Sequence, residues 1–557
     1  MISRRTFLKK SMLGTMALSA LGITSQCRKL KKRPNVLFII CDDLNDWVED
    51  LGGHPQAHTP NIDRLMSSGV SFTNAFSNNP VCGPSRTSFL TGIYPHNSGY
   101  FGYNQNAKGM EFRNFAKLKN AKTMMEHFYD NGYNVYGTGK VFHNGHEDWS
   151  VWQGYDEGEK YFGIEPTFGP LAWNGSYKKG THDHAIGLPH PQILPDPDSY
   201  KHWGNSFASL ANIPEYPPEP EKSIPGYKGW ICFGEPFHYN GPADRDLTPD
   251  ELNAEYAGKI LKKDHARPFF LTVGFNRPHT PLHAPKKYFD MFPLDKVKMP
   301  KIKEDDLLDC ADALWNPIQT WNDNGFKKYD FLTEHPKPEM LKKWVRAYLA
   351  CIAFVDDQIG KLLSTLKDSK YADDTIVVFT SDHGYHEGEK EWVFKASLWE
   401  ESSRVPFVID HPGLKNPGAD VSHPISLIDI YPTLIDMCNL PQNPNENTNQ
   451  MPLDGYSLTP FLADPDTEDW PGPDIALISV ASDTRLDSGE AGKPEDQFYA
   501  ARSARYRYIL CPNGEEELYD HKNDPYEWHN LADDSKYRNV KKQLNEQLKA
   551  LVFEQNK

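Results

Sequence analysis

Five short runs of apolar residues in this chain have the length and composition of buried β-strands. They occupy residues 35–40, 133–136, 269–273, 375–379 and 405–409. Amphipathic helical patterns lie between several of them, and the clearest places apolar side chains from Trp344 to Leu366 on one helix face. Alternating strands and helices predict an α/β fold in which these runs form a parallel sheet with helices on both sides.

Four of the predicted strands are followed directly by polar residues. The first runs into Asp42-Asp43, the second into residues 137–143, the third into residues 276–279 and the fourth into residues 381–384. Ligands of open α/β sheets bind beyond the carboxyl ends of the strands. The sequence therefore predicts that acids, histidines and a lysine meet at one edge of the sheet.

The acids at this edge are candidate metal ligands. Asp42, Asp43 and Asp382 offer hard oxygen atoms, which suit Ca²⁺ or Mg²⁺ better than zinc. A single Asp in such a place is more simply a helix cap or a turn residue. An Asp-Asp and an Asp-His pair at the ends of two apolar strands favour a metal site instead.

Cys82 lies in a segment that predicts the start of a helix. Pro84 suits the first helical turn, which would leave Cys82 at the N-terminus, where free amides and the helix dipole attract an anion. Arg86, four residues on, would reach the same place. From this segment alone, a buried structural cysteine in front of a helix is an equally simple interpretation.

The N-terminus has the pattern of a twin-arginine signal peptide over residues 1–27. Arg4-Arg5 precede an apolar run at 12–23, which is shorter than the roughly 20 residues of a membrane span. Cys27 would carry lipid in a lipoprotein, or is incidental. The pattern predicts a periplasmic, cell-surface or secreted protein without a membrane span. Loss of residues 1–26 would move the formal net charge from -16 to -20, which argues against a nucleic-acid partner.

The segment Cys82-Gly83-Pro84-Ser85-Arg86, with Leu90-Thr91-Gly92 after it, resembles the C-x-P-x-R signature of type I sulfatases. Further similar segments lie at residues 35–43, 59–63, 132–143, 380–384, 398–406 and 518–531. The resemblance implies a large mixed, mostly parallel sheet flanked by helices, as in alkaline phosphatase, with a smaller C-terminal α+β domain. It also implies conversion of Cys82 to formylglycine, whose hydrate attacks sulfur.

The resemblance assigns a metal site. Asp42, Asp43, Asp382 and the formylglycine at Cys82 would bind one Ca²⁺. Position 383 is Asn in many sulfatases and His here, and with residues 139–143 this resembles the iduronate-2-sulfatase branch. His383 would then be a further ligand, although nitrogen is an unusual partner for calcium.

The same resemblance assigns catalytic roles. Arg86 and Lys140 would stabilise the charged nucleophile region, and His143 would take the remaining hydroxyl proton as sulfate is expelled. His279 and Lys395 resemble the residues that grip the sulfate and assist the leaving sugar oxygen. Each of these two, taken alone, is more simply a structural histidine or a solvated lysine.

Two parts follow the signal peptide in this interpretation, and the first contains a long insertion. Residues 34–465 would be the catalytic domain, with a Pro- and aromatic-rich insertion at 144–250 that shapes the substrate pocket. Residues 466–557 would be a C-terminal subdomain with a short antiparallel sheet and a final helix at 536–553.

The resemblance predicts hydrolysis of a sulfate ester on a sulfated sugar or polysaccharide fragment, such as a 2-O-sulfated uronic acid. A formylglycine-generating or anaerobic sulfatase-maturating enzyme would be a partner. Two alternatives are a phosphodiesterase or phosphonate hydrolase of the same superfamily, and a noncatalytic glycan-binding lipoprotein. Arg86 and the iduronate-like pair of histidines favour the sulfatase over the first alternative, and the full set of polar residues makes the second the weakest.

Overall fold

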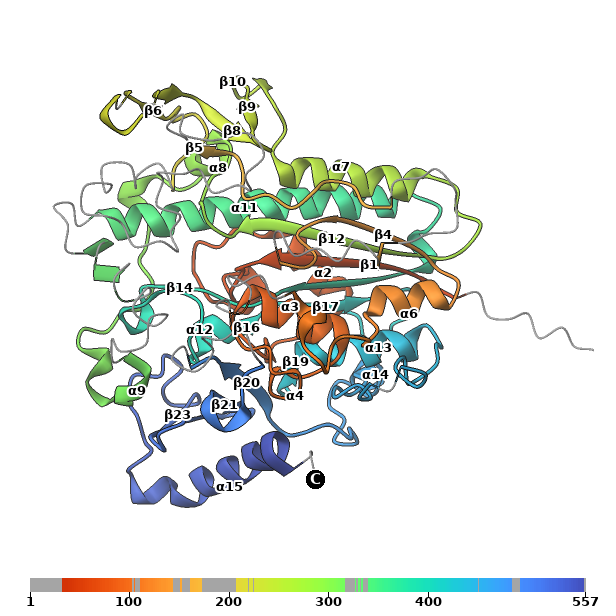
Figure 1. Ribbon diagram of the computed structural model, residues 1–557, viewed down its shortest axis with the longest axis vertical. Helices are drawn as coiled ribbons and strands as arrows, with labels where there is room; N and C mark the ends of the chain where they lie inside the picture. The colour runs from red at the N-terminus through yellow and green to blue at the C-terminus, as the bar shows by residue number, and fades with distance from the viewer. Residues whose placement is uncertain are drawn as a thin grey trace, which may run out of the picture. The chain divides into compact units, whose positions relative to one another are not determined.

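A seven-stranded sheet forms the centre of the computed structural model (Figure 1). The structure describes residues 33–102, 105, 111–143, 151–152, 161–172, 207–218, 220–223, 225–315, 326, 329–330, 332–333, 339–448, 450–482 and 491–554. The predicted signal peptide, Cys27 included, lies outside this part of the chain. Residues from Asn35 onward form one compact unit, distinct from Met1–Pro34.

The strand order confirms the mixed, mostly parallel sheet. It runs β18 (Ala419–Val421), β2 (Val70–Phe72), β17 (Phe407–Asp410), β13 (Thr375–Ser381), β1 (Asn35–Asp42), β12 (Phe269–Pro278) and β4 (Asn134–Gly139). β13, β1, β12 and β4 are parallel neighbours. These are the four strands whose polar endings were singled out.

The fifth predicted strand differs from the expectation. β17 begins at Phe407 and runs antiparallel to β13, whereas Arg404–Val405 forms a separate short strand, β16, beside β3 (Ala75–Phe76). Pro406 separates the two because it has no N–H to donate to a strand ladder. The prediction that residues 405–409 join the sheet as one parallel strand is therefore wrong.

Helices cover both faces of the sheet. The side chains of β1 alternate between two hydrophobic cores: Leu37 and Ile39 pack on one face, and Phe38 and Ile40 on the other. On the first face lie α7 (Pro249–Lys262) and α11 (Met340–Lys367), and on the second α3 (Cys82–Thr91), α6 (Met124–Asp130) and α13 (Ile430–Met437) (Figure 1). The apolar stripe predicted from Trp344 to Leu366 is buried along α11.

The C-terminal part confirms the predicted antiparallel sheet and final helix. The sheet consists of β20 (Ala476–Val480), β21 (Phe498–Arg502), β22 (Tyr506–Leu510) and β23 (Glu516–Asp520). Helix α15 (Arg538–Lys549) packs on it through Leu544 and Leu548 and continues into a π-helical turn at Ala550–Glu554. The boundary between residues 465 and 466 stays a prediction.

The described parts of the 144–250 insertion contain short strands. β5 (Leu171–Ala172), β8 (Trp230–Cys232) and β9 (Glu235–Phe237) form one small sheet, and β6 (Glu215–Tyr216) pairs with β7 (Tyr227–Lys228). β10 (Tyr239–Gly241) pairs with β11 (Asp244–Arg245). Among the described residues, none of the helices combines the length and apolar character that crossing a bilayer requires.

Candidate active site

The four parallel strands deliver their polar endings to one edge, as predicted. Cys41 and Ser381 are register partners in β1 and β13, so Asp42 and Asp382 emerge side by side. β12 ends one residue before His279, and β4 ends one residue before Lys140. Gly139 has a φ of 73°, and a Cβ there would lie 2.0 Å from the carbonyl oxygen of Gly274, so the turn that places Lys140 requires glycine.

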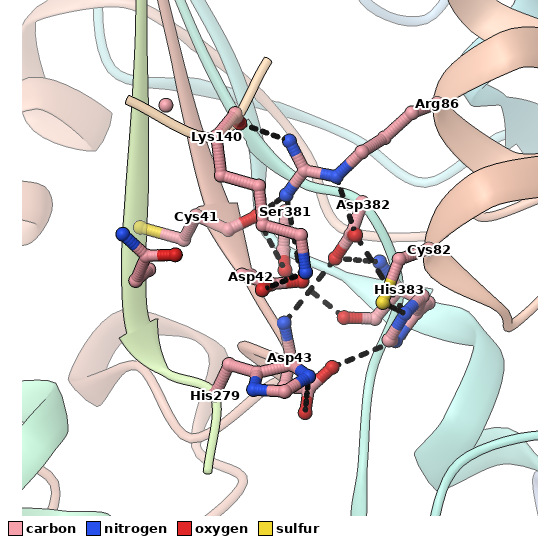
Figure 2. A network of polar contacts seen from close by, with 12 residues as sticks. Cys41, Asp42, Asp43, Cys82, Arg86, Lys140, His279, Ser381, Asp382 and His383 are labelled. Carbon is pink, nitrogen blue, oxygen red and sulfur yellow. Dashed lines mark hydrogen bonds and ion pairs between the residues drawn. The ribbon is translucent and has the colours of Figure 1, made fainter. Parts of the chain in front are cut away.

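Cys82 is the first residue of α3, and its thiol is buried against charged groups (Figure 2). Its Sγ lies 2.9 Å from Nζ of Lys395 and 3.3 Å from Nε2 of His383. Burial raises the pKa of the Cys82 thiol to about 12, even though Lys140 and Lys395 act to lower it. The unmodified thiol is therefore a poor nucleophile near neutral pH.

A compact set of metal-binding atoms surrounds this sulfur. Ligand atoms of Asp42, Asp43, Cys82 and His383 all lie within 4.8 Å of one another. Oδ1 of Asp42 and Oδ2 of Asp43 are buried without a hydrogen-bond partner. Buried carboxylate oxygens need a partner, and a hard cation in this space would supply it. The site thus fits a divalent cation.

His383 is oriented as a ligand would be. Its Nδ1 lies 2.9 Å from the carbonyl oxygen of Gly384, which fixes the proton on that atom and leaves the Nε2 lone pair facing Cys82. Burial, with the charge of Lys395, holds the pKa of His383 well below its usual value, so the imidazole is neutral. A neutral imidazole is the form that binds metals.

Asp382 stands beside this set and is held by donors. Nε of Arg86 lies 2.8 Å from its Oδ2, while the amides of His383 and Asp43 donate to its Oδ1 at 3.0 and 3.2 Å. Arg86 also reaches Asp42, with 3.5 Å between Nη2 and Oδ1. Arg86 therefore links two of the three predicted acidic ligands and offsets their mutual repulsion.

The acids differ in charge state because their neighbours differ. Burial alone would raise the pKa of Asp42, but Lys140, His279 and Arg86 hold it well below its usual range. Burial raises the pKa of Asp43 to about 7 against the charge of Lys395. Burial likewise raises the pKa of Asp382 to about 6. The three carboxylates crowd one space, and a cation would relieve the repulsion among them.

Three further predicted catalytic residues, Lys140, Lys395 and His279, adjoin the cluster. Lys140 pairs with Oδ2 of Asp42, and Nζ of Lys395 lies 2.6 Å from Oδ1 of Asp43. Nε2 of His279 lies 3.8 Å from Oδ2 of Asp43. His143 is partly exposed on the segment that follows Lys140, and its role as proton acceptor stays a prediction.

Sequence reasoning missed several residues that build the site. Tyr348 of α11 donates its hydroxyl to the carbonyl oxygen of Asp43 at 2.6 Å, and Asp43 itself has a left-handed φ of 64°. Phe168, from the insertion, stacks on His279 with ring centroids 4.8 Å apart. The apolar stripe of α11 flagged Tyr348 as a core residue only, and Phe168 carries no local signal.

The doubly covered sheet and the buried acid, imidazole and cysteine cluster at its carboxyl edge define an alkaline-phosphatase-like hydrolase. Comparison with known proteins narrows this class. The sulfatase family model matches residues 34–440, and the model of the N-sulphoglucosamine sulphohydrolase C-terminal region matches residues 388–554. The chain belongs to the sulfatase family and is a sulfuric ester hydrolase.

Individual relatives agree with this assignment. A sulfatase of Formosa agariphila is 31% identical over 551 residues, covering 95% of this chain and 88% of the relative. Human iduronate 2-sulfatase is 27% identical, with 93% and 94% of the two chains covered. A choline-sulfatase and an arylsulfatase are also relatives, so the iduronate branch is one of several to which the chain is similar.

Solved structures share the fold. A 2-O GAG sulfatase superposes with a TM-score of 0.61 at 21% identity, covering 94% of this chain and 92% of that one. The phosphonate monoester hydrolase of Agrobacterium radiobacter gives a TM-score of 0.64 at 24% identity, covering 93% and 95%. At these identities the likeness is one of architecture.

Proposed function

We propose that this sulfatase removes sulfate from a sulfated sugar or polysaccharide fragment, with Cys82 oxidised to formylglycine and one Ca²⁺ beside it. The observation that carries the proposal is the position of Cys82 at the start of α3, in contact with Lys395 and His383 and beside carboxylate oxygens that accept no hydrogen bond. An anionic ester placed there would meet cations and helix amides together.

A hydrated aldehyde at position 82 would supply an oxygen nucleophile and, on the same carbon, a second hydroxyl for releasing sulfate. Lys395 provides positive charge next to Asp43, and Lys140 provides it next to Asp42. His279 would give a proton to the leaving sugar oxygen, and His143 would accept the proton of the remaining hydroxyl.

Calcium suits the donors of this site. Asp42, Asp43 and Asp382 would hold it through oxygen, with His383 as the nitrogen ligand. The ion would supply positive charge where negative charge accumulates during S–O cleavage. Oxygen-rich sites favour Ca²⁺ or Mg²⁺ over zinc, and Ca²⁺ accepts an irregular set of oxygen ligands more readily than Mg²⁺ does.

The sugar preference is proposed from relatives. Besides iduronate 2-sulfatases, they include an ulvan-active sulfatase of Formosa agariphila at 26% identity. We propose a 2-O-sulfated uronic acid or related sugar as substrate, with the 144–250 insertion shaping the pocket. Deletion of part of the insertion should change substrate preference, and an unchanged preference would contradict this role.

A phosphonate or phosphodiester hydrolase is the second candidate, because phosphonate monoester hydrolases share the fold. Matched 4-nitrophenyl sulfate, phosphate and phenylphosphonate esters separate the two. A rate highest on the sulfate supports our proposal. The noncatalytic glycan-binding alternative has no support, because the chain belongs to an enzyme family and its catalytic side chains are assembled.

Mass spectrometry of the peptide containing Cys82, from protein matured with a formylglycine-generating or anaerobic maturating enzyme, is the direct test. The proposal expects an aldehyde in place of the thiol, together with desulfation of defined sulfated oligosaccharides. A matured enzyme that retains the thiol and still hydrolyses sulfate esters would overturn the formylglycine role.

Export remains a proposal that rests on residues 1–27. Fractionation of cells that express the full chain should place it outside the cytoplasm, and replacement of Arg4 and Arg5 by Lys should retain it inside. Labelling with a radioactive fatty acid, and its loss in Cys27→Ala, would show whether Cys27 carries lipid.

A further inference from the structure

We infer that Phe168, from the 144–250 insertion, is a positioning residue that orients the imidazole of His279 for proton transfer to the leaving oxygen. The inference rests on the proposed function and adds to it a residue from outside the sulfatase motifs. It also gives the insertion a direct role in turnover, beyond shaping the pocket.

The ring of Phe168 lies beside both His279 and Lys140. Its plane is inclined by 25° to the His279 imidazole at a centroid distance of 4.8 Å, which is a stacked contact. Nζ of Lys140 lies 5.2 Å from the centroid of the same ring. Phe168 is 8% exposed and His279 1%, so the contact is buried. The aromatic ring of Phe168 therefore contacts both of these proposed catalytic residues.

The stacking of Phe168 on His279 fixes the tilt of the imidazole ring, which a hydrogen bond at one ring atom leaves free. Nδ1 of His279 lies 2.5 Å from the carbonyl oxygen of Thr280, so this nitrogen carries a proton and Nε2 points toward Asp43. A hydrogen bond at one ring atom allows the ring to tilt about that atom. A face contact with Phe168 sets the plane of the ring, and proton transfer depends on that plane.

One buried guanidinium holds the backbones of both residues. Arg277, the second-last residue of β12, donates from Nη1 to the carbonyl oxygen of His279 at 3.2 Å. Its Nη2 reaches the carbonyl oxygens of Phe168 and Gly169, each at 3.5 Å. The Arg277 amide in turn donates to Asp250 at 3.0 Å. Phe168 and His279 are thus tied to the same strand of the central sheet.

The small sheet of β5, β8 and β9, called the insertion sheet below, packs on the loop that carries His279. Trp230 of β8 lies against the ring of His283 at 4.6 Å, and the amide of Leu210 donates to the carbonyl oxygen of Ala284 at 3.1 Å. Gly169 follows Phe168 directly, and a Cβ there would lie 2.8 Å from Sγ of Cys232. This close packing leaves Phe168 little freedom to move away from His279.

The step that depends on this geometry is the departure of the sugar. As the nucleophile bonds to sulfur, the bond between sulfur and the sugar oxygen breaks, and its electron pair stays on that oxygen. His279 acts here as an imidazolium with a proton on each ring nitrogen: it gives the Nε2 proton to this oxygen and is left as a neutral imidazole that keeps the Nδ1 proton. An alkoxide is a poor leaving group that needs this proton, whereas 4-nitrophenolate leaves without it. Loss of Phe168 should therefore slow sugar esters selectively.

The test measures kcat and KM of matured, Ca²⁺-loaded enzyme on a sulfated oligosaccharide and on 4-nitrophenyl sulfate. In Phe168→Ala we expect kcat on the oligosaccharide to fall by about 10- to 100-fold and kcat on the aryl ester by about threefold at most. Phe168→Tyr, which keeps a ring for stacking, should recover most of the loss, and Phe168→Leu should not.

A double-mutant cycle shows whether Phe168 acts through His279. His279→Ala should lose more oligosaccharide turnover than Phe168→Ala, and Phe168→Ala in that background should cost nothing further. Phe237→Leu is the matched control, because Phe237 is buried in the insertion sheet away from His279. Phe237→Leu should lower kcat on both esters by the same factor or leave both values unchanged.

Equal losses of Phe168→Ala on the two esters, or full additivity with His279→Ala, would overturn the inference. Thermal unfolding identifies any variant that fails to fold. If Phe168→Ala fails, kcat on the two esters is compared between Phe168→Tyr and the wild type instead. A wild-type enzyme that carries formylglycine and hydrolyses neither sulfate ester would instead refute the proposed function.

Discussion

The ammonium nitrogen of Lys395 lies 2.9 Å from the sulfur of Cys82. The same nitrogen contacts Asp43 at 2.6 Å, so one buried cation joins the proposed nucleophile to a proposed metal ligand. Burial opposes the charge, but Asp43 and Cys82 raise the pKa of Lys395 above its usual value. The side chain therefore stays protonated throughout the working pH range, and it delivers a fixed positive charge to the place where sulfate must bind.

Replacing Lys395 by Ala should lower kcat on any sulfate ester by about 10²- to 10³-fold, the usual cost of losing one charged stabiliser of a transition state. Lys395→Arg should not restore activity, because a planar guanidinium cannot occupy the space of a point charge held at 2.6 Å from Asp43. Lys287→Ala, at an exposed lysine paired with Asp357, is the control and should leave kcat unchanged. Wild-type rates in Lys395→Ala would remove this residue from the site.

Calcium should stabilise the protein through Asp42 and Asp43. At a concentration 100 times its dissociation constant, a bound ion adds about 2.7 kcal/mol to the free energy of unfolding. Differential scanning calorimetry should therefore show a higher Tm with Ca²⁺ and a lower one after chelation. In Asp42→Asn this response should shrink or vanish.

The control for the calcium response is Asp290→Asn, at an exposed acid that pairs with Lys286. It should keep the full wild-type shift in Tm. An Asp42→Asn variant that responds to Ca²⁺ as the wild type does would place the ion elsewhere.

Arg507 should be essential for the stability of the junction between the C-terminal sheet and the loop after Lys395. It is fully buried, pairs with Glu400 and Glu527, and donates to the carbonyl oxygen of Leu398 at 2.6 Å. Removing one member of a buried ion network costs about 3–5 kcal/mol. Urea unfolding of Arg507→Ala should show a loss of this size.

Lys542→Ala provides the comparison, because Lys542 pairs with Glu546 on the surface and both side chains are exposed. Its unfolding midpoint should stay close to that of the wild type. Glu400 and Glu527, with His521, also have the spacing of metal ligands, but their carboxylates are already neutralised by arginine. A wild-type midpoint for Arg507→Ala would show that the network adds nothing to stability.

His283 should make the protein less stable in mild acid. Burial, partly offset by a hydrogen bond to the carbonyl oxygen of Ala208, lowers the pKa of His283 to about 3. The pKa of histidine in the unfolded chain is about 6.5. Between the folded and unfolded pKa values, His283 binds a proton only when the chain is unfolded. The contribution of His283 to stability is therefore complete above the pKa of the unfolded chain, and it declines as the pH falls toward the pKa of the folded protein.

The size of this effect from pH 7 to pH 5 is about 2 kcal/mol for the single site. His283→Gln keeps a donor for Ala208 and cannot titrate, so urea unfolding should show a smaller difference between the two pH values than in the wild type. His529→Gln, at an exposed histidine, should show the wild-type difference. Equal pH dependence in all three proteins would contradict the assignment.

The sequence by itself determined the central strands and which polar residues follow them. Buried parallel strands are continuous apolar runs, and the residues after them must lie at one edge, so Asp42, Asp382, His279 and Lys140 were predictable as neighbours. The position of Cys82 at a helix start followed from Pro84. These are local signals, read within a few residues of each position.

The tertiary structure decided what depends on long-range packing. The direction of β17 is set by its partner β13, and an apolar run looks the same in either direction. The contact of Phe168 with His279 joins residues more than 100 positions apart through Arg277, and no periodicity marks either partner. Local patterns indicate which face of an element is buried. Which side chains contact each other depends on how the elements pack in the folded protein.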